Sequence, residues 1–366
     1  GIVPGRAIAC AGRELETLAL DEVVPRGEAG GSDHWRELWA VSALEDMGFD
    51  EKLRRAFLEL SLGDGFVGRV ARIDADLAQL FLESGELTAR VPRKVLRAEL
   101  GRPVTGDWVA CTEGAEAIVE SVLPRRSELV RRAAGKRERP QILCTNVDVL
   151  FVVMGLDGDF NPRRLERYLT LAAEGRLKPV VLLTKAGLCD RVESLVAEAK
   201  AVARDVDVHA IDVLAKIAED APLRYLDRGV TAAVVGSSGA GKSTLVNALL
   251  GESRMRVKSV RARDDRGKHT TTHRELMLLP VGGAIIDTPG LRELGLWADA
   301  GALETAFPDV MALAPSCRFR DCGHRSEPGC ALSAAVESGA LDSARVASYT
   351  ALAKELERRA RSPRRG

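Results

Sequence analysis

Hydrophobic and polar positions alternate in short runs over residues 65–123. Such runs occur at five places, separated by Gly, Pro and Asp turns: 66–73, 79–82, 89–92, 107–111 and 117–122. A period of two residues is typical of a β-strand that buries one face. Five such strands joined by short turns predict a small all-β unit, and a five-stranded barrel is the simplest form of it.

From residue 146 onward the apolar runs become continuous and alternate with helical patterns. Strands are predicted at 149–154, 179–183, 206–211, 231–235, 276–279 and 284–286, and helices at 162–174, 192–202 and 243–250. The first of these helices starts at Asn161 and Pro162, an N-cap followed by proline at the first helical position. Strands that are apolar throughout are buried on both faces, so this stretch predicts an α/β unit, a parallel sheet with helices on each side.

The remaining stretches are strongly charged or helical. Residues 1–62 are acidic, with an amphipathic helix expected near 35–60, and residues 124–140 are interpreted as a basic linker. Residues 300–366 are expected to be helical around a cysteine cluster. We therefore predict four units: an acidic N-terminal extension (1–62), a barrel (63–125), an α/β domain (126–298) and a helical domain with a basic tail (299–366).

Composition supports a soluble multidomain protein. The chain has 366 residues, more than one hydrophobic core usually serves, with 46% hydrophobic and 29% charged residues. Its apolar runs fall far short of the roughly 20 residues of a membrane-spanning helix, and residues 1–6 show no basic-then-apolar secretion pattern. Seven cysteines, four of them scattered, fit reduced thiols better than a disulfide framework. We expect a cytoplasmic protein with no membrane partner.

The net charge of zero hides an uneven distribution. The 53 cations balance 53 anions, yet residues 1–51 hold 4 basic and 11 acidic residues, so the rest of the chain carries a net charge of +7. Only 11 of the cations are lysine, and the arginine excess suits contacts with phosphate. This basic body indicates RNA contact, with an ordinary solvated surface as the alternative.

The strongest chemical motif follows the predicted strand at 231–235. It has the pattern G-x-x-x-x-G-K-[ST] and consists of Gly236, Ser237, Ser238, Gly239, Ala240, Gly241, Lys242 and Ser243, followed by Thr244. A strand before it and a helix after it are the context of a phosphate-binding loop. Its backbone N–H groups would turn toward phosphates, Lys242 would reach the β- and γ-phosphates, and Ser243 would bind Mg²⁺. The alternative is a chance glycine-rich turn.

Two later segments would complete a nucleotide site. The segment 287–290 ends a predicted strand, so that Asp287 could hold Mg²⁺ and the Gly290 N–H could meet the γ-phosphate, although an ordinary turn can have this sequence. The polar stretch 267–272 lies between the two motifs and includes Thr271, which a nucleotide switch would offer to Mg²⁺. A flexible charged loop is the alternative for that stretch.

A possible base-reading motif precedes the phosphate-binding loop. Thr184, Lys185, Ala186 and Gly187 resemble the guanine-recognition pattern N/T-K-x-D, with Gly187 in the place of the carboxylate. In ordinary small GTPases this pattern follows the phosphate-binding loop, whereas here it comes about 50 residues earlier. The order predicts a circularly permuted GTPase sheet, because the ends of a compact sheet can be rejoined around the same site.

Cysteines and a histidine form a second chemical cluster near the C-terminus. Cys317, Cys322, His324 and Cys330 place three thiols and an imidazole within fourteen residues. This set matches a closed tetrahedral zinc site, and the absence of an evident catalytic glutamate favours a structural role. Three buried cysteines beside an unrelated histidine are the alternative.

A barrel, a permuted GTPase domain and a Cys3His module, in this order, resemble the ribosome small-subunit-dependent GTPase A family (RsgA, also called YjeQ). The resemblance covers residues 60–360 and rests on eight segments: 106–109, 123–126, 146–148, 165–169, 236–243, 269–272, 287–293 and 317–324. It implies an OB-fold barrel that binds RNA and a GTPase that binds the small ribosomal subunit and its rRNA. It further implies that GTP hydrolysis to GDP is stimulated by that subunit and coupled to its late maturation and to factor release. We expect a monomer that holds one structural Zn²⁺, and Mg²⁺ together with GTP.

Two departures from GTPase patterns affect the expected chemistry. Leu291 stands where many GTPases have a water-orienting glutamine, so we expect His269 to take that catalytic role, with a surface histidine as the alternative. Gly187 lacks the guanine-reading carboxylate, and Asp212 stands where a small serine is more usual. We therefore predict weaker guanine affinity and poorer rejection of other purines, which Gly187→Asp should reverse.

Three functions remain open on the sequence alone. A ribosome-assembly GTPase is favoured. A P-loop ATPase or kinase for a small molecule gains from the missing aspartate but is opposed by the segment 287–290 and the switch threonines. A nucleotide-binding RNA-interaction protein with little catalysis is favoured by Leu291 and Gly187.

Overall fold

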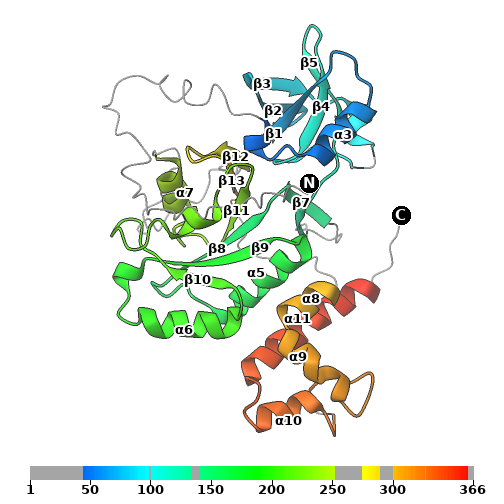
Figure 1. Ribbon diagram of the computed structural model, residues 1–366. Coiled ribbons are helices and arrows are strands. Elements are labelled where there is room, and N and C mark those ends of the chain that lie inside the picture. Colours follow the sequence, from blue (N-terminus) through cyan, green and yellow to red (C-terminus); the bar gives the residue numbers. More distant parts are fainter. Residues whose placement is uncertain are drawn as a thin grey trace, which may run out of the picture.

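The computed structural model describes residues 44–98, 100–132, 140–251, 274–288, 300–325 and 327–361. Figure 1 shows a barrel of strands at the top, an α/β unit in the middle and a helical part below. A 3₁₀ helix η1 (Leu44–Met47) and helix α3 (Glu51–Glu59) precede the barrel, and Asp50 caps α3 by accepting a hydrogen bond from the Leu53 N–H. The described end of the acidic segment is thus helical, as predicted.

Five strands close into a barrel in the order β1-β2-β3-β5-β4, which confirms the predicted all-β unit. They are β1 (Phe66–Asp74), β2 (Leu77–Leu82), β3 (Gly85–Arg90), β4 (Trp108–Thr112) and β5 (Ala117–Val122), with the short helix α4 (Arg93–Leu96) after β3. This closed five-stranded order, with β3 parallel to β5, is that of an OB-fold. Strand β3 begins earlier than predicted, because it pairs with β2 from Gly85 opposite Leu82 across a two-residue turn.

The stretch predicted as a basic linker contains the first strand of a β-hairpin instead. Strand β6 (Glu128–Arg132) pairs antiparallel with β7 (Pro140–Thr145). Leu129, Leu143 and Cys144 are buried there. The linker prediction was wrong because the arginines of this stretch outweighed its few apolar positions, and the second strand begins only where the linker was expected to end.

A six-stranded sheet in the order β10-β9-β8-β11-β13-β12 forms the α/β unit. Its strands are β8 (Val149–Gly155), β9 (Lys178–Thr184), β10 (Asp207–Ala210), β11 (Thr231–Val235), β12 (Glu275–Leu278) and β13 (Ala284–Asp287). Five strands are parallel, but the edge strand β12 runs antiparallel to β13, so the expectation of a wholly parallel sheet was wrong. The connection from β12 to β13 is too short for the crossover that a parallel pair needs.

Helices cover both faces of this sheet, as predicted. Helices α5 (Pro162–Gly175) and α6 (Val192–Ala203) pack with one set of alternate strand residues, such as Val152 and Val181, and α7 (Lys242–Leu250) packs with the other, such as Val153 and Val180. Short 3₁₀ helices η2 (Ala186–Leu188) and η3 (Ala221–Tyr225) lie in the connections. Helix α5 starts as expected, since the Asn161 side chain accepts a hydrogen bond from the Arg164 N–H.

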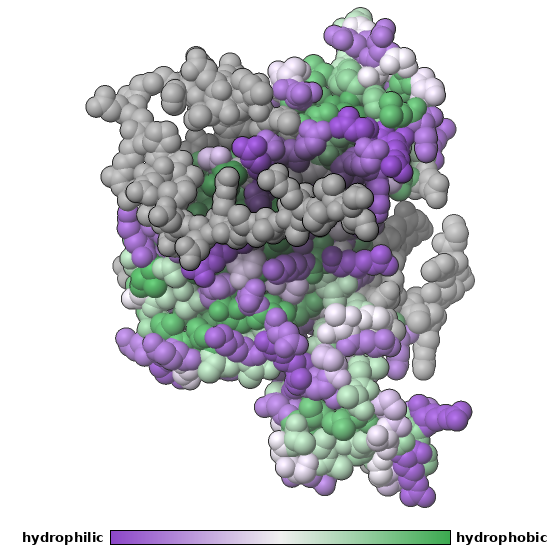
Figure 2. Space-filling view, viewed as in Figure 1, coloured by the Kyte–Doolittle hydropathy of each residue, from purple (hydrophilic) through white to green (hydrophobic). Residues whose placement is uncertain are grey.

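The C-terminal part is helical and lies against α5 (Figure 1). It comprises α8 (Ala300–Ala306), α9 (Pro308–Leu313), η4 (Ala314–Ser316), α10 (Ala331–Glu337) and α11 (Ser343–Arg361). Arg345 of α11 donates hydrogen bonds to Asp309 on α9 and to Glu166 on α5, which ties this part to the α/β unit. No helix in the described ranges is long and apolar enough to cross a bilayer. Figure 2 shows hydrophilic residues gathered over the lower part of the barrel, around α3.

Candidate functional site

A glycine-rich loop connects β11 to α7 at the carboxyl end of the sheet. Gly241 has a φ of +91° immediately before the helix, and Gly236 has a φ of +151° where a Cβ would collide with the Val153 carbonyl oxygen. Only glycine can take both positions without strain. The loop therefore turns tightly into the N-terminus of α7, where the N–H groups of a first helical turn and the helix dipole favour a bound anion.

The Lys242 side chain folds back onto the start of the glycine-rich loop. Its Nζ donates hydrogen bonds to the carbonyl oxygens of Gly236 (2.8 Å) and Ser237 (2.5 Å). The ammonium group is thus held at the rim of the loop, and Ser243 follows it in the first turn of α7. The structure brings the predicted phosphate-binding residues 236–244 together at one loop and helix start.

Asp287 ends β13, beside β11, and is buried. Burial raises the pKa of its carboxyl group, and the positive charge of Lys242 opposes this. Among the described residues, no hydrogen-bond partner reaches its Oδ1 atom. A buried carboxylate oxygen without a protein donor is suited to a cation, because buried polar groups otherwise find partners. The neighbouring Thr288 fixes this strand end by donating to the Val234 carbonyl oxygen at 2.5 Å.

The proposed base-reading segment leaves β9 beside the phosphate-binding loop. The Thr184 hydroxyl donates a hydrogen bond to the Ala240 carbonyl oxygen at 2.6 Å, so the two segments touch. Lys185 adopts a left-handed backbone (φ +62°), and its Nζ pairs with Asp157 Oδ2 at 2.5 Å. Gly187 follows, exposed at the end of the segment.

Two aspartates that the sequence analysis missed support both segments. Asp157 and Asp159 lie in the loop after β8, between the phosphate-binding loop and β9. Asp159 Oδ2 accepts hydrogen bonds from the Ser237 hydroxyl (2.5 Å) and the Gly155 N–H (3.2 Å), while Asp157 holds Lys185. Their position after a central parallel strand was a signal, because ligands bind at that edge of such sheets.

The expected switch residues lie outside the described part of the chain. These are His269, Thr271, Gly290 and Leu291. The described chain resumes at Arg274, whose carbonyl oxygen accepts a hydrogen bond from the Thr105 hydroxyl of the barrel at 3.2 Å. The roles predicted for the four switch residues stay predictions.

The four predicted metal ligands converge near η4 and α10. One ligand atom from each of Cys317, Cys322, His324 and Cys330 lies within 4.8 Å of every other. His324 Nδ1 is 3.5 Å from Cys317 Sγ and 3.7 Å from Cys330 Sγ. Tetrahedral zinc with bonds of about 2.0–2.3 Å needs ligand atoms about 3.5–3.8 Å apart, so the cluster fits such an ion. The Ala331 N–H also donates to Cys317 Sγ at 3.3 Å.

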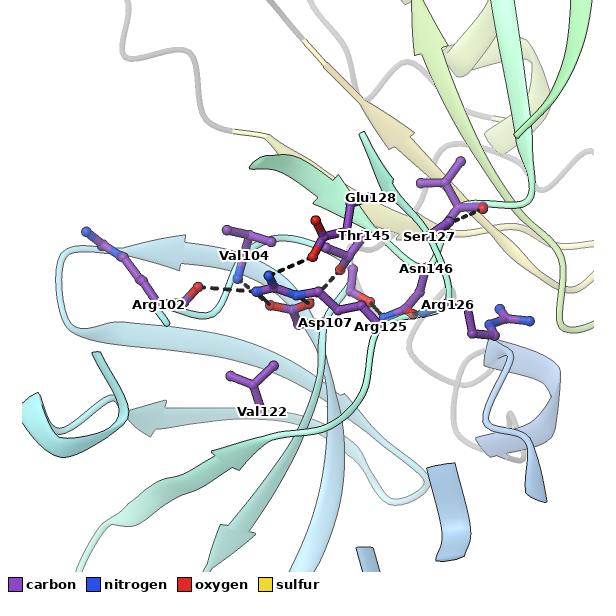
Figure 3. Close-up of polar contacts among 12 residues, drawn as sticks. Arg102, Val104, Asp107, Val122, Arg125, Arg126, Ser127, Glu128, Thr145 and Asn146 are labelled. Atoms are coloured by element: carbon purple, nitrogen blue, oxygen red, sulfur yellow. Dashed lines mark hydrogen bonds and ion pairs between the residues drawn. The ribbon is translucent and has the colours of Figure 1, made fainter. Parts of the chain in front are cut away.

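A buried polar network joins the barrel to the α/β unit (Figure 3). Asp107 accepts two hydrogen bonds from Arg125, both at 2.8 Å, and a third from the Thr145 hydroxyl of β7 at 2.6 Å. The Asn146 side chain links the Gly106 carbonyl oxygen to the Arg126 N–H. Nearby, Arg69 of β1 is fully buried, and burial lowers its pKa to about 9.

Comparison with known proteins identifies the family. The family model described as RsgA GTPase matches residues 122–297. A relative from Opitutus terrae, named Small ribosomal subunit biogenesis GTPase RsgA, is 41% identical over 327 residues, which cover 85% of this chain and 89% of the relative. The chain belongs to the RsgA GTPase family. An RsgA from Xylella fastidiosa, with the same name, is 49% identical over 263 residues, covering 70% of this chain and 76% of that protein.

Solved structures show the RsgA fold as well. The crystal structure of YjeQ from Thermotoga maritima superposes with a TM-score of 0.60 at 24% identity, covering 80% of this chain and 98% of that one. YloQ, whose title calls it a circularly permuted GTPase, superposes with a TM-score of 0.56 at 23% identity, covering 82% and 98%. The predicted family and its circularly permuted GTPase fold are confirmed.

Proposed function

We propose that this chain hydrolyses GTP to GDP and phosphate and acts in the biogenesis of the small ribosomal subunit. The observation that carries the proposal is the 41% identity, through 85% of the chain, to a relative named for that activity. The geometry agrees, since a phosphate-binding loop, a buried strand-end carboxylate and a base-side segment meet at one edge of the sheet. Binding to the subunit would be stimulatory and would couple hydrolysis to its late maturation and to factor release.

The nucleotide would lie along this edge. The loop 236–244 would cradle its phosphates, Lys242 would neutralise the β- and γ-phosphates, and Thr184, Lys185 and residue 187 would line the base side. Ser243, Thr271 and Asp287 would hold Mg²⁺, which the Asp287 Oδ1 atom fits, and Gly290 would contact the γ-phosphate. Mg²⁺ held there would neutralise part of the negative charge on the phosphates.

His269 would orient the attacking water, because Leu291 offers no hydrogen bond for that role. Single-turnover GTP hydrolysis by His269→Ala, with small subunits present, tests this assignment. The rate should fall by about 10²-fold or more if a positioned base is lost. An unchanged rate would remove His269 from the mechanism.

Zinc would bind the Cys3His cluster as a structural ion, since four protein ligands leave no open position. Cys322→Ser should lose the zinc and destabilise the helical domain 299–366, because metal binding at such sites contributes folding free energy. Cys189→Ser, which alters a half-buried cysteine outside the cluster, is the matched control. Zinc content and thermal unfolding measure both variants, and zinc retained by Cys322→Ser would contradict the assignment.

The barrel (63–125) and the helical domain would contact rRNA, with the GTPase domain (126–298) between them and the acidic extension (1–62) ahead of them. The net charge of +7 after residue 51 supports this arrangement. The chain would work as a cytoplasmic monomer that meets its partner on the ribosome.

The decisive experiment compares GTP and ATP hydrolysis with and without small ribosomal subunits. We expect GTP hydrolysis to be slow alone and strongly stimulated by the subunits, and Lys242→Ala to lose both activities. Equal hydrolysis of ATP would favour a small-molecule ATPase or kinase. Subunit binding without stimulated hydrolysis would favour an RNA-interaction protein with little catalysis.

A further inference from the structure

Gly187 has no side-chain carboxylate, but the carboxylate of Asp212 lies beside it. Strands β9 and β10 are parallel neighbours, so the segments that follow them lie at one edge of the sheet. Asp212 comes two residues after the end of β10, and its Oδ2 accepts a hydrogen bond from the Gly187 N–H at 3.1 Å. A Cβ built on Gly187 would lie 3.2 Å from that same oxygen. The Asp212 oxygen is therefore in tight contact with the place that a side chain at 187 would fill.

We propose that Asp212 supplies the guanine-reading carboxylate that residue 187 lacks. The inference rests on the proposed GTPase function and names the residue that sets its base specificity. Guanine offers the N1–H and N2–H groups as donors at its edge, and an aspartate oxygen at this position would accept from them. Adenine offers no such pair of donors, so the contact favours guanine.

Among the described residues, the hydrogen bonds that Asp212 accepts leave one of its acceptor positions for this contact. Its Oδ1 accepts from the N–H groups of Leu214 and Ala215, both at 3.0 Å, and these bonds shape its own loop. Its Oδ2 accepts only from Gly187 among the described residues. A carboxylate has about four acceptor positions, two on each oxygen, so Oδ2 keeps one for a base. Asp212 is 7% exposed, and its side chain is held by three hydrogen bonds, which fixes its direction.

The position fits the path of a nucleotide whose phosphates lie on the loop 236–241. Thr184 touches that loop, Lys185 follows, and Gly187 with Asp212 lies next along the same edge. The loops that carry Gly187 and Asp212 also expose two apolar side chains, Leu188 (74% exposed) and Leu214 (86% exposed). Apolar groups of this kind are suited to contact with the flat faces of a base.

This geometry limits the gain in GDP affinity expected from Gly187→Asp. The new carboxylate would be forced against Asp212 Oδ2, and two like charges at this distance repel. The single substitution should therefore not tighten GDP binding. Tightening requires that Asp212 lose its carboxylate at the same time.

Titration calorimetry of the full chain with GDP, XDP and ADP tests the proposal. Xanthine carries an oxygen where guanine has its N2 amino group, so an amide donor in place of the Asp212 carboxylate would favour it. In Asp212→Asn, the side-chain oxygen stays with the N–H groups of Leu214 and Ala215, so the amide nitrogen replaces Oδ2 beside the base and the Gly187 N–H loses its acceptor. We expect GDP affinity to fall by about tenfold or more, the scale of a lost charged hydrogen bond, and XDP affinity to rise. Asp190→Asn makes the same change on an exposed aspartate nearby and should leave both affinities unchanged.

A second pair of variants separates base reading from loop shape. Serine at position 212 can still accept from N–H groups of its own loop but carries no charge. Asp212→Ser should weaken GDP binding, and Gly187→Asp combined with Asp212→Ser should restore it to at least the wild-type affinity. GDP affinity that is unchanged in Asp212→Asn, or that falls together with ADP affinity without a gain for XDP, would overturn the proposal. So would a double variant no better than Asp212→Ser alone.

The wild-type chain separates this inference from the proposed function. If it binds ADP as tightly as GDP, the proposed GTPase function fails together with the role of Asp212. If it prefers GDP and Asp212→Asn keeps that preference, only the role of Asp212 fails.

Discussion

At the scale of single residues, Asp287 is a carboxylate that is buried at a cost to the fold. Burial raises the pKa of its carboxyl group, so its ionised form is disfavoured in the folded chain without a cation. Asp287→Asn keeps the shape and removes the charge. We expect the Mg²⁺-dependent gain in GTP affinity to fall by about tenfold or more, as for other perturbed metal sites. The metal-free variant should be at least as stable as the wild type.

Titration of GTP over a range of Mg²⁺ concentrations, together with urea unfolding, checks both expectations. Asp205→Asn, on an exposed aspartate, is the control and should alter neither quantity. Unchanged Mg²⁺ dependence in Asp287→Asn would argue that the buried carboxylate serves the fold and not the cation.

Residues of the site were predictable where the chemistry is local. The phosphate-binding loop needs its glycines, lysine and serine within eight consecutive residues, so the motif is visible without a structure. Asp159 was missed because its partner Ser237 lies 78 residues away, and only the sheet brings them together. Asp212 was noticed as a departure, yet its contact with Gly187 depends on two strands being neighbours.

At the scale of elements, Arg345 joins three helices. It donates to Asp309 at 2.6 and 2.8 Å and to Glu166 at 3.1 Å, and all three side chains are at least nine-tenths buried. Burial would raise the pKa of Asp309, but the hydrogen bonds and charge of Arg345 outweigh it and lower that pKa. For Glu166, burial dominates and raises the pKa. Of these two carboxylates, Asp309 is therefore the one whose ionised form is stabilised in the folded chain.

Asp309→Asn should thus destabilise the chain by about 3 kcal/mol near neutral pH, because it leaves a buried guanidinium partly unpaired. A carboxylate whose pKa is lower in the folded chain stabilises it above the ordinary value of 3.8 and loses this effect as the pH falls further. The difference from the wild type should therefore shrink below that pH. Urea unfolding across the range measures it, with Glu304→Gln on the exposed face of α8 as control. A pH-independent difference would contradict the assignment to Asp309.

Elements were predictable where one chain segment carries the whole pattern. The buried strands β8, β9 and β11 have continuous apolar runs, and α5 has its own N-cap, so all four were found near their observed positions. The hairpin β6–β7 was not found, because its apolar residues stand among arginines and its register depends on the partner strand. The direction of β12 likewise cannot be read from its own apolar residues, because it depends on the short connection to β13.

At the scale of the whole molecule, a buried charge pair at the end of the barrel contacts the α/β unit. Arg125 is 4% and Asp107 0% exposed at their side chains, and Thr145 from the hairpin completes the contact. The barrel also reaches the chain just before β12, through Thr105 and Arg274. Under the proposed function, this junction would couple RNA contact on the barrel to the strand that follows the expected switch segment.

Asp107→Asn tests whether the junction makes the two parts one cooperative unit. Among the described residues, the substitution leaves the buried Arg125 guanidinium with Glu128, which is 39% exposed, as its one carboxylate partner. Breaking a buried pair in this way costs about 3–5 kcal/mol. We expect calorimetry to show one unfolding transition for these parts in the wild type and two in the variant, because Asp107 and Arg125 also carry the contacts to Thr145 and Glu128 that join the parts. Asp74→Asn breaks an exposed ion pair of the barrel with Arg72 and should leave one transition. A single transition that only shifts to lower temperature in Asp107→Asn would show that Asp107 stabilises the fold without being the link on which coupling between barrel and switch depends.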